Sequence, residues 1–272
     1  MTATLIAVAH GTRDPAGLAT HEALVARVRA RAAGAPVRLA YLDHAHPSLL
    51  SVLDGLGGGP AVVVPLLLTA ATHSKTDLPG LVREARRRGG RISYASPLGP
   101  HALLLEALEL RLAEAGVPDS AAVVLAAAGA ADPDANAEVA KVARLLWERR
   151  AAGRTDQPPV EPAYTTATAP DVPTAVRRLR LLGAASVAVA PYFLAPGRLP
   201  AAARPGDPDV LTAGVLGDCD PVADLVVQRY QEGLAGIAAA PCDTCFYRRP
   251  WPGKEQYAGA PQPLRLHPAD LR

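Results

Sequence analysis

The chain has 272 residues, of which 49% are hydrophobic and 20% are charged, a composition typical of a soluble globular protein of about two domains. Its net charge of +2, with Lys and Arg dispersed along the chain, argues against nucleic acid as a partner. No apolar run reaches the ~18 residues of a membrane span, and the first residues lack the basic region of a secretory signal. We therefore expect a cytoplasmic protein without a membrane partner.

The first half of the chain alternates predicted strands and helices. The predicted strands cover 5–9, 37–42, 61–68 and 92–95, and the predicted helices cover 20–33, 47–56, 78–88 and 103–115. The third of these strands is apolar throughout, as expected for a parallel strand that is covered on both faces. This alternation predicts a parallel sheet with right-handed crossovers.

The second half repeats the order, with strands at 123–127, 160–164, 187–194 and 210–214 and helices at 136–151, 173–182 and 221–234. Turn motifs recur with it: Asp14-Pro15 matches Asp132-Pro133, and Leu98-Gly99 matches Leu216-Gly217. We therefore predict two tandem α/β domains at 1–117 and 118–238, each with a mostly parallel four-stranded sheet flanked by helices, and a Pro-rich tail at 239–272.

Two histidines follow predicted strands of the first half. His10 comes directly after the first strand and His73 follows the third, so both are expected at the carboxyl edge of the sheet, where α/β proteins bind ligands. Imidazole suits Fe²⁺, Co²⁺, Ni²⁺ and Zn²⁺, and two such ligands hold an ion without enclosing it. The matching positions of the second half are Ala128 and Leu199, which predicts that the chemistry belongs to the first half.

Three motifs resemble the CbiX/SirB family of sirohydrochlorin chelatases, the class II chelatases that need no ATP. They are Ala9-His10-Gly11-Thr12-Arg13-Asp14-Pro15, the segment 65–79 with His73 and Asp77, and Pro97-Leu98-Gly99-Pro100-His101. The resemblance covers nearly the whole chain, in a long two-half arrangement similar to actinobacterial members. It implies two chelatase-like domains that face each other across a cleft, with the second half enclosing the substrate.

The resemblance also implies a reaction. The chain would insert Fe²⁺, or alternatively Co²⁺, into sirohydrochlorin, making sirohaem or cobalt-sirohydrochlorin, a cobalamin precursor. His10 and His73 would bind the metal and accept the pyrrole protons. The affinity order of divalent metals does not choose among Fe²⁺, Co²⁺ and Ni²⁺.

The implied substrate is rich in carboxylates, so cationic residues near the two histidines are candidate contacts. Arg13 and Lys75 are close in sequence to them, and Arg198 lies at the corresponding place of the second half. His101 is either a helix N-terminal residue or a further contact.

The remaining histidines carry weaker signals. His44 and His46 have the alternate spacing of a metal pair and are candidates for a metal entry point, or for residues outside the site. His21 falls on a predicted helix, where we expect it to be solvated.

In the reducing cytoplasm we expect the three cysteines to be free or to bind a metal rather than to form disulfides. Cys242 and Cys245 form a CxxC motif, which resembles a family segment associated with an iron–sulfur cluster. Because a cluster needs about four ligands, Cys219, His267 or a second chain would complete it, and zinc is an alternative. Cys219 by itself is typical of a small buried apolar residue.

Two other classes of function are compatible with the sequence. A non-catalytic tetrapyrrole or metal carrier would share the cleft. A phosphoryl-transfer enzyme is suggested by Ala9-His10-Gly11, which is similar to the Arg-His-Gly of histidine phosphatases but lacks the arginine. The oligomeric state, monomer or homodimer, is not determined by the sequence.

Overall fold

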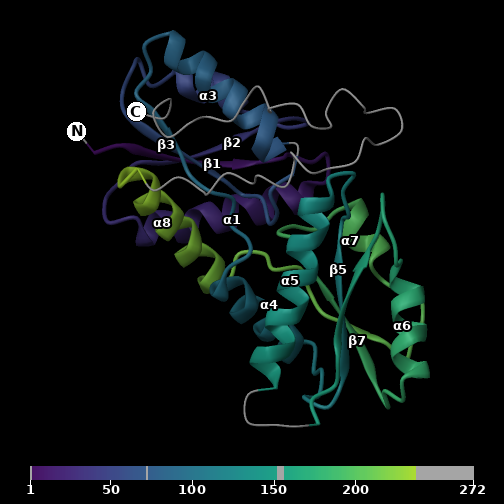
Figure 1. The fold of residues 1–272 in the computed structure, drawn as a ribbon. Coiled ribbons are helices and arrows are strands. Elements are labelled where there is room, and N and C mark those ends of the chain that lie inside the picture. Colours follow the sequence, from purple (N-terminus) through teal and green to yellow (C-terminus); the bar gives the residue numbers. More distant parts are fainter. Residues whose placement is uncertain (1, 72, 152–155, 237–272) are drawn as a thin grey trace.

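Two parallel sheets, one in each half of the sequence, form the framework of the molecule (Figure 1). The computed structural model describes residues 2–71, 73–151 and 156–236. Within them, the first sheet has the order β2-β1-β3-β4 and the second has the order β6-β5-β7-β8. The strands are β1 Thr4–Ala9, β2 Val37–Tyr41, β3 Ala61–Pro65, β4 Ile92–Tyr94, β5 Ala122–Ala127, β6 Val160–Tyr164, β7 Val187–Pro191 and β8 Leu211–Thr212. All neighbouring strands pair in parallel, so the predicted duplicated α/β fold is confirmed.

Helices connect the strands of each sheet. They are α1 Pro15–Arg31, α2 Leu49–Asp54, α3 Leu78–Arg87, α4 Ala102–Glu114, α5 Pro133–Arg150, α6 Val172–Leu181, α7 Arg198–Ala202 and α8 Asp220–Leu234, with a short π-helical segment, η1 His73–Asp77, before α3. Among the described residues, no helix combines the length and the apolar composition that crossing a bilayer requires.

Helices α1 and α5 begin earlier than the sequence pattern predicts. The Asp14 side chain accepts a hydrogen bond from the Ala16 N–H, and the Asp132 side chain accepts one from the Asp134 N–H, each with Pro as the next residue. Asp at the N-cap and Pro at the first helical position are the favoured start of a helix. The repeated Asp-Pro pair is therefore a helix start and not a turn preceding one.

The central strands β1 and β5 are buried along their whole length. In β1, alternate side chains enter different cores: Leu5 joins a core that extends into the second half, and Ile6 joins a smaller core in the first half. This two-sided burial explains why these strands read as uninterrupted apolar runs.

Helix α8 comes from the second half of the sequence but packs on the first sheet. It contacts α1 and β3, beside which it lies in Figure 1. A Cβ on Gly233 would lie 2.4 Å from a Val62 methyl carbon, so a residue without a side chain allows this close packing. The Tyr230 hydroxyl donates to the Ala3 carbonyl at 2.6 Å.

Helix α4 does the reverse: it comes from the first half of the sequence but contacts α5 and β7 of the second half. We call this reciprocal packing the exchange of α4 and α8. Arg111 of α4 donates to the Leu216 carbonyl at 3.1 and 2.8 Å, and Arg229 of α8 donates to the carbonyls of Pro97 and Leu98 at 2.9 and 3.1 Å. Leu98 and Leu216 occupy equivalent turns of the two halves. The last helix of each half, α4 or α8, is therefore anchored to the opposite half through an arginine. The predicted domain boundary near residue 117 stays a prediction.

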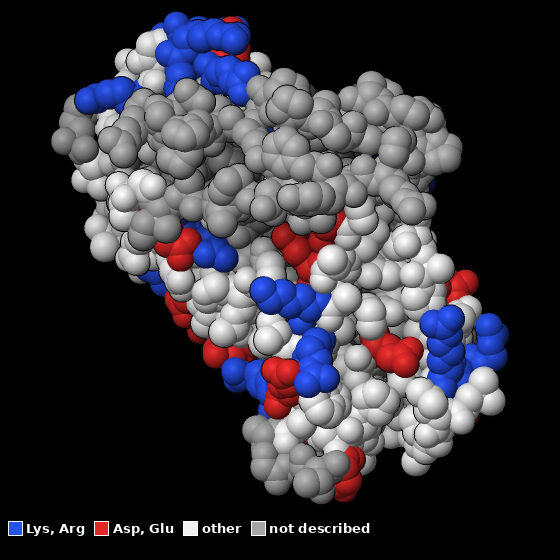
Figure 2. Space-filling model, viewed as in Figure 1, with Lys and Arg blue, Asp and Glu red and all other residues white. Residues whose placement is uncertain are grey.

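Charged side chains of both signs are interspersed over the lower part of the face shown in Figure 2, whereas basic side chains gather over α3 at the top. Much of that positive charge is neutralised within the chain. Arg87 and Arg88 pair with Glu84, and Arg88 also pairs with Asp54.

Candidate functional site

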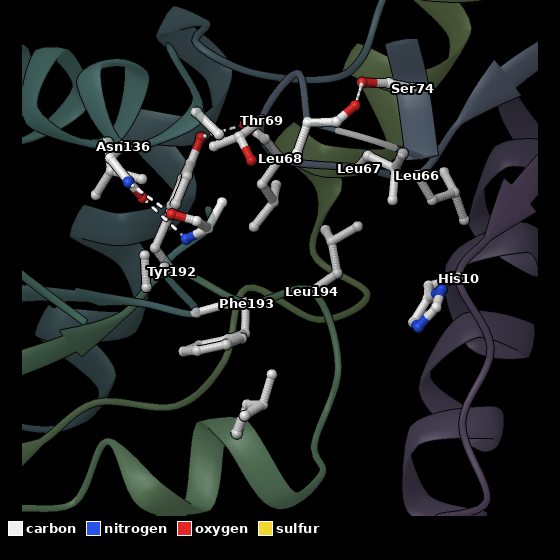
Figure 3. A pocket seen from close by; sticks show the side chains of 18 residues that line it. His10, Leu66, Leu67, Leu68, Thr69, Ser74, Asn136, Tyr192, Phe193 and Leu194 are labelled. Carbon is white, nitrogen blue, oxygen red and sulfur yellow. Dashed lines mark hydrogen bonds between the residues drawn. The ribbon is translucent and has the colours of Figure 1, made fainter. Parts of the chain in front are cut away.

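A cavity of about 300 Å³ lies where the carboxyl ends of the two sheets meet. His10 lines it from the end of β1, together with Leu66 to Leu68 after β3. The opposite wall comes from residues that follow β5 and β7, including Tyr192 and Phe193. Figure 3 shows His10 on one side of this space and Tyr192 and Phe193 on the other. The cavity places the first-half imidazole opposite a mostly apolar wall of the second half.

The second half forms its wall from small residues. Ala128, the counterpart of His10, lines the cavity with Gly129 and Ala130. The Asn136 side chain holds this loop by accepting from the Ala130 N–H at 2.9 Å and donating to the Ala130 carbonyl at 2.8 Å. The wall is thus firmly held but carries no imidazole at the position equivalent to His10.

His44 lies beside His10. Their ring centroids are 5.8 Å apart, and the rings meet edge to face at 77°. The Asp43 carboxylate lies 3.4 Å from His44 Nδ1, and the Asp43 N–H donates to the His10 carbonyl at 2.9 Å. Gly11 allows this approach, because a Cβ there would lie 1.8 Å from the Asp43 carbonyl oxygen. The loop after β2 therefore returns to the carboxyl end of β1.

The second half forms the same turn without a histidine. His44 and Ala167 both have left-handed backbones, with φ of 61° and 62°, and a Cβ on Gly129 would clash with the Thr166 carbonyl as one on Gly11 would with Asp43. His46 likewise corresponds to Ala169. The turn therefore forms without imidazoles. The presence of His44 in the first half, where the second half has Ala167, is the sequence signal that could have assigned His44 to the site.

His73 is the first residue of η1, and its side chain lies outside the described residues. Lys75, two residues later, donates to Asp132 and Asp134 at 2.9 Å each. Burial alone would lower the pKa of Lys75, but these two carboxylates outweigh burial and raise it. Asp132 and Asp134 therefore bind the Lys75 ammonium group, which the sequence suggested as a contact for substrate. The contact between Lys75 and substrate stays a prediction.

Arg13 and Arg198 are exposed and flank a junction between the halves. Gly17 of α1 packs against the Pro196 carbonyl there, since an added Cβ would lie 2.9 Å from its oxygen. Neither arginine is among the residues that line the cavity, and their contact with substrate stays a prediction.

His101 is the N-cap of α4. Its Nδ1 accepts from the Leu103 N–H at 3.2 Å, and burial together with the nearby Arg229 lowers its pKa. The structure thus gives His101 the helix N-terminal role, at a place that does not line the cavity.

His21 is buried, so the prediction of a solvated side chain was wrong. It is 8% exposed, packs beside Tyr41, and makes no hydrogen bond through Nδ1 within the described part of the chain. His21 lies on the buried face of α1 with Leu24, Val25 and Val28, and its ring packs beside Tyr41 of β2.

Cys219 is a buried core residue at the start of α8, and burial raises the pKa of its thiol. Cys242, Cys245 and His267 lie outside the described residues. Within the described residues, no group of three or more His, Cys, Asp and Glu side chains forms a metal site. The suggested iron–sulfur cluster would need Cys242 and Cys245 and so lies outside the described residues.

Comparisons with known proteins agree with this geometry. A sequence model of the CbiX family matches residues 4–115 and again 122–233. The sirohydrochlorin cobaltochelatase of Priestia megaterium is 31% identical over 264 residues, which cover 90% of this chain and 84% of that protein. The sirohydrochlorin ferrochelatase of Bacillus subtilis (strain 168) is 29% identical over 205 residues, covering 73% of this chain and 77% of that protein.

The solved structure of SirB from Bacillus subtilis with Fe³⁺ superposes with a TM-score of 0.74 at 26% identity. The match covers 87% of this chain and 97% of that one. The two family matches coincide with the two sheets and meet at the cavity that His10 lines. This chain belongs to the CbiX family.

Proposed function

We propose that this protein inserts a divalent metal ion, Fe²⁺ or alternatively Co²⁺, into sirohydrochlorin without ATP. The observation that carries the proposal is His10 on one wall of a mostly apolar cavity between two CbiX-type halves. An apolar cavity suits the face of a flat macrocycle, while an imidazole at its edge suits a metal ion. The relatives support the substrate and differ in the metal, since one is a cobaltochelatase and another a ferrochelatase.

The first half supplies the chemistry in this proposal. His10 and His73 present the metal ion, and because insertion displaces two pyrrole protons, the same imidazoles serve as bases near neutral pH. His44 joins them as a further metal-handling residue, with the Asp43 carboxylate orienting its ring through Nδ1. Arg13 and Arg198 are proposed to meet substrate carboxylates at the junction of the halves.

Anaerobic turnover tests the proposal. Purified protein with an excess of sirohydrochlorin and either Fe²⁺ or Co²⁺ should convert many equivalents of substrate, followed by the change in visible absorption. His10→Ala should reduce the rate roughly 100-fold or more, towards the spontaneous rate, because it removes a ligand and a base. His44→Ala should cost about tenfold, as for a residue that supports a metal site.

The second half shows that these turns tolerate alanine, because Ala128 and Ala167 occupy the matching positions. The control is His46→Ala, which copies Ala169 and should keep the wild-type rate, since the ring contact to His10 comes from His44. A wild-type rate for His10→Ala would refute its assigned role. Conversion that stops at one equivalent would instead identify a carrier.

A further inference from the structure

The segment between β3 and α3, described at residues 66–71 and 73–77, is held from the opposite half. The Tyr192 hydroxyl donates to the Leu68 carbonyl at 3.2 Å, and the Ala70 N–H donates to Glu138 Oε2 at 2.7 Å. Figure 3 shows Tyr192 beside Leu68 and Thr69 at the edge of the cavity. The first part of the segment is thus bound to β7 and α5 while it lines the cavity.

The last part of the segment is bound to α5 by ion pairs. Lys75 Nζ lies 2.9 Å from both Asp132 Oδ2 and Asp134 Oδ2, and the three side chains are 17%, 10% and 13% exposed. Asp132 also caps α5 through its other oxygen, so the ammonium is attached to the rigid start of a helix. Because the three side chains are largely buried and the carboxylates belong to the start of α5, the contact favours one position of the segment.

Most of these contacts are not inherited from the duplicated fold. Asp132 corresponds to Asp14, which caps α1 in the same way, but Asp134 and Glu138 correspond to Ala16 and Thr20 of α1. The second half has therefore lost the imidazoles and carries acidic groups directed at the first half instead.

His73 lies in the sequence between the two attachments, three residues after Ala70 and two before Lys75. We propose that Lys75, Asp132, Asp134 and Glu138, called here the interdomain clamp, are positioning residues that hold the His73 segment for metal delivery. The inference rests on the proposed function. It assigns Asp132, Asp134 and Glu138 of the second half the role of positioning His73, a metal ligand of the first half.

Co²⁺ binding to the protein alone provides the first test, because the visible spectrum of Co²⁺ reports its ligands without turnover. Lys75→Met should weaken Co²⁺ binding about tenfold and change its visible bands, as expected when support for a metal ligand is lost. Lys75→Arg should restore most of the affinity, because the guanidinium can still bridge Asp132 and Asp134. Asp134→Asn and Glu138→Gln are milder variants for use if Lys75→Met does not fold.

A double-mutant cycle separates positioning from general destabilisation. If Lys75 acts through His73, Lys75→Met should add little to the loss of Co²⁺ affinity already caused by His73→Ala. Full additivity of the two losses would overturn the proposal. In turnover, Lys75→Met should lower kcat about tenfold and leave the KM for sirohydrochlorin nearly unchanged.

The chain offers a matched control. Arg31 of α1 bridges Asp220 and Asp224 of α8 at 2.6 and 2.9 Å, so it also joins the two halves through two carboxylates, but it is not on the segment that carries His73. Arg31→Met should leave Co²⁺ spectra and kcat at wild-type values. Equal losses for Arg31→Met and Lys75→Met would refute the clamp. A wild-type protein without turnover would refute the proposed function, while the Co²⁺ spectra still decide the clamp.

Discussion

His10 and His44 illustrate how single residues acquire a role from the chain that surrounds them. Each follows a parallel strand, and Gly11 permits the close approach that brings the two rings edge to face. The Asp43 carboxylate lies 3.4 Å from His44 Nδ1 and also accepts a hydrogen bond from the His44 N–H at 2.7 Å. The equivalent turns of the second half form with alanine at 128 and 167, so the fold itself does not require either ring.

His21 yields a prediction about stability and pH. Burial lowers its pKa from 6.5 to about 4, so the folded protein keeps the ring neutral while the unfolded chain protonates it. The unfolded state then binds more protons between these pH values, and stability falls as the pH drops from about 6.5 to 4. The loss from this group is of order 3 kcal/mol.

Urea unfolding across this pH range measures that loss. The matched variant is His21→Val, because the equivalent position of α5 is the buried Val139. The variant should lose much less stability between pH 6.5 and 4 than the wild type does. Parallel pH profiles for the two proteins would show that His21 does not titrate as its burial requires.

At the scale of elements, the exchange of α4 and α8 is the main feature. Neither helix covers only the sheet of its own half, and each is anchored by an arginine to the turn after the fourth strand of the other. Helix α8 also approaches β3 so closely that its packing depends on a glycine. An alanine at position 233 would gain up to about 1 kcal/mol of helix propensity but would collide with Val62.

We predict that Gly233→Ala destabilises the protein by about 1–3 kcal/mol, because overpacking at a buried β-branched side chain exceeds the helical gain. Gly80→Ala in α3 is the control, since among the described residues no atom outside its own helical turn and chain neighbours lies within 4 Å of its added Cβ, and it should be neutral or slightly stabilising. Denaturant midpoints compare the two. A Gly233→Ala protein at least as stable as the wild type would contradict the close packing of α8, and Val62→Ala should relieve the loss if the packing is as described.

For the whole molecule, the exchange joins the two halves through a shared core. The largest core cluster contains side chains from both sheets, including Leu5 and Leu125. The ion pairs that join α1 to α8 are exposed, and such surface pairs contribute only about 0–1 kcal/mol each. The apolar core, rather than surface charge, therefore joins the halves.

It follows that residues 1–117 should not fold as a stable monomer, because without α8 the β3 face of the first sheet loses its cover. Circular dichroism melting and light scattering on this fragment provide the measurement. Loss of the cooperative transition is expected, or else a dimer in which α4 of a second copy replaces α8. A monomeric fragment that melts near the temperature of the intact chain would contradict the shared core.

The parts of the fold that the sequence predicts are those with local causes. A buried parallel strand is a short apolar run, and the turn that follows it carries Gly or Asp-Pro, so the strand positions and the place of His10 follow from neighbouring residues. The same pattern places the starts of α1 and α5 too late, because Asp-Pro is typical of turns as well as of helix starts. The burial of His21 escapes the pattern because it depends on how α1 packs beside Tyr41 of β2, a contact between residues 20 positions apart.

The sequence by itself determined the duplicated parallel α/β fold and the asymmetry between His10 and Ala128, because periodicity, turn chemistry and a repeat are properties of neighbouring residues. The tertiary structure alone decided the exchange of α4 and α8, the approach of His44 to His10 and the pairing of Lys75 with Asp132 and Asp134. These contacts join residues far apart along the chain. Their geometry depends on how two packed sheets face each other, which no local pattern encodes.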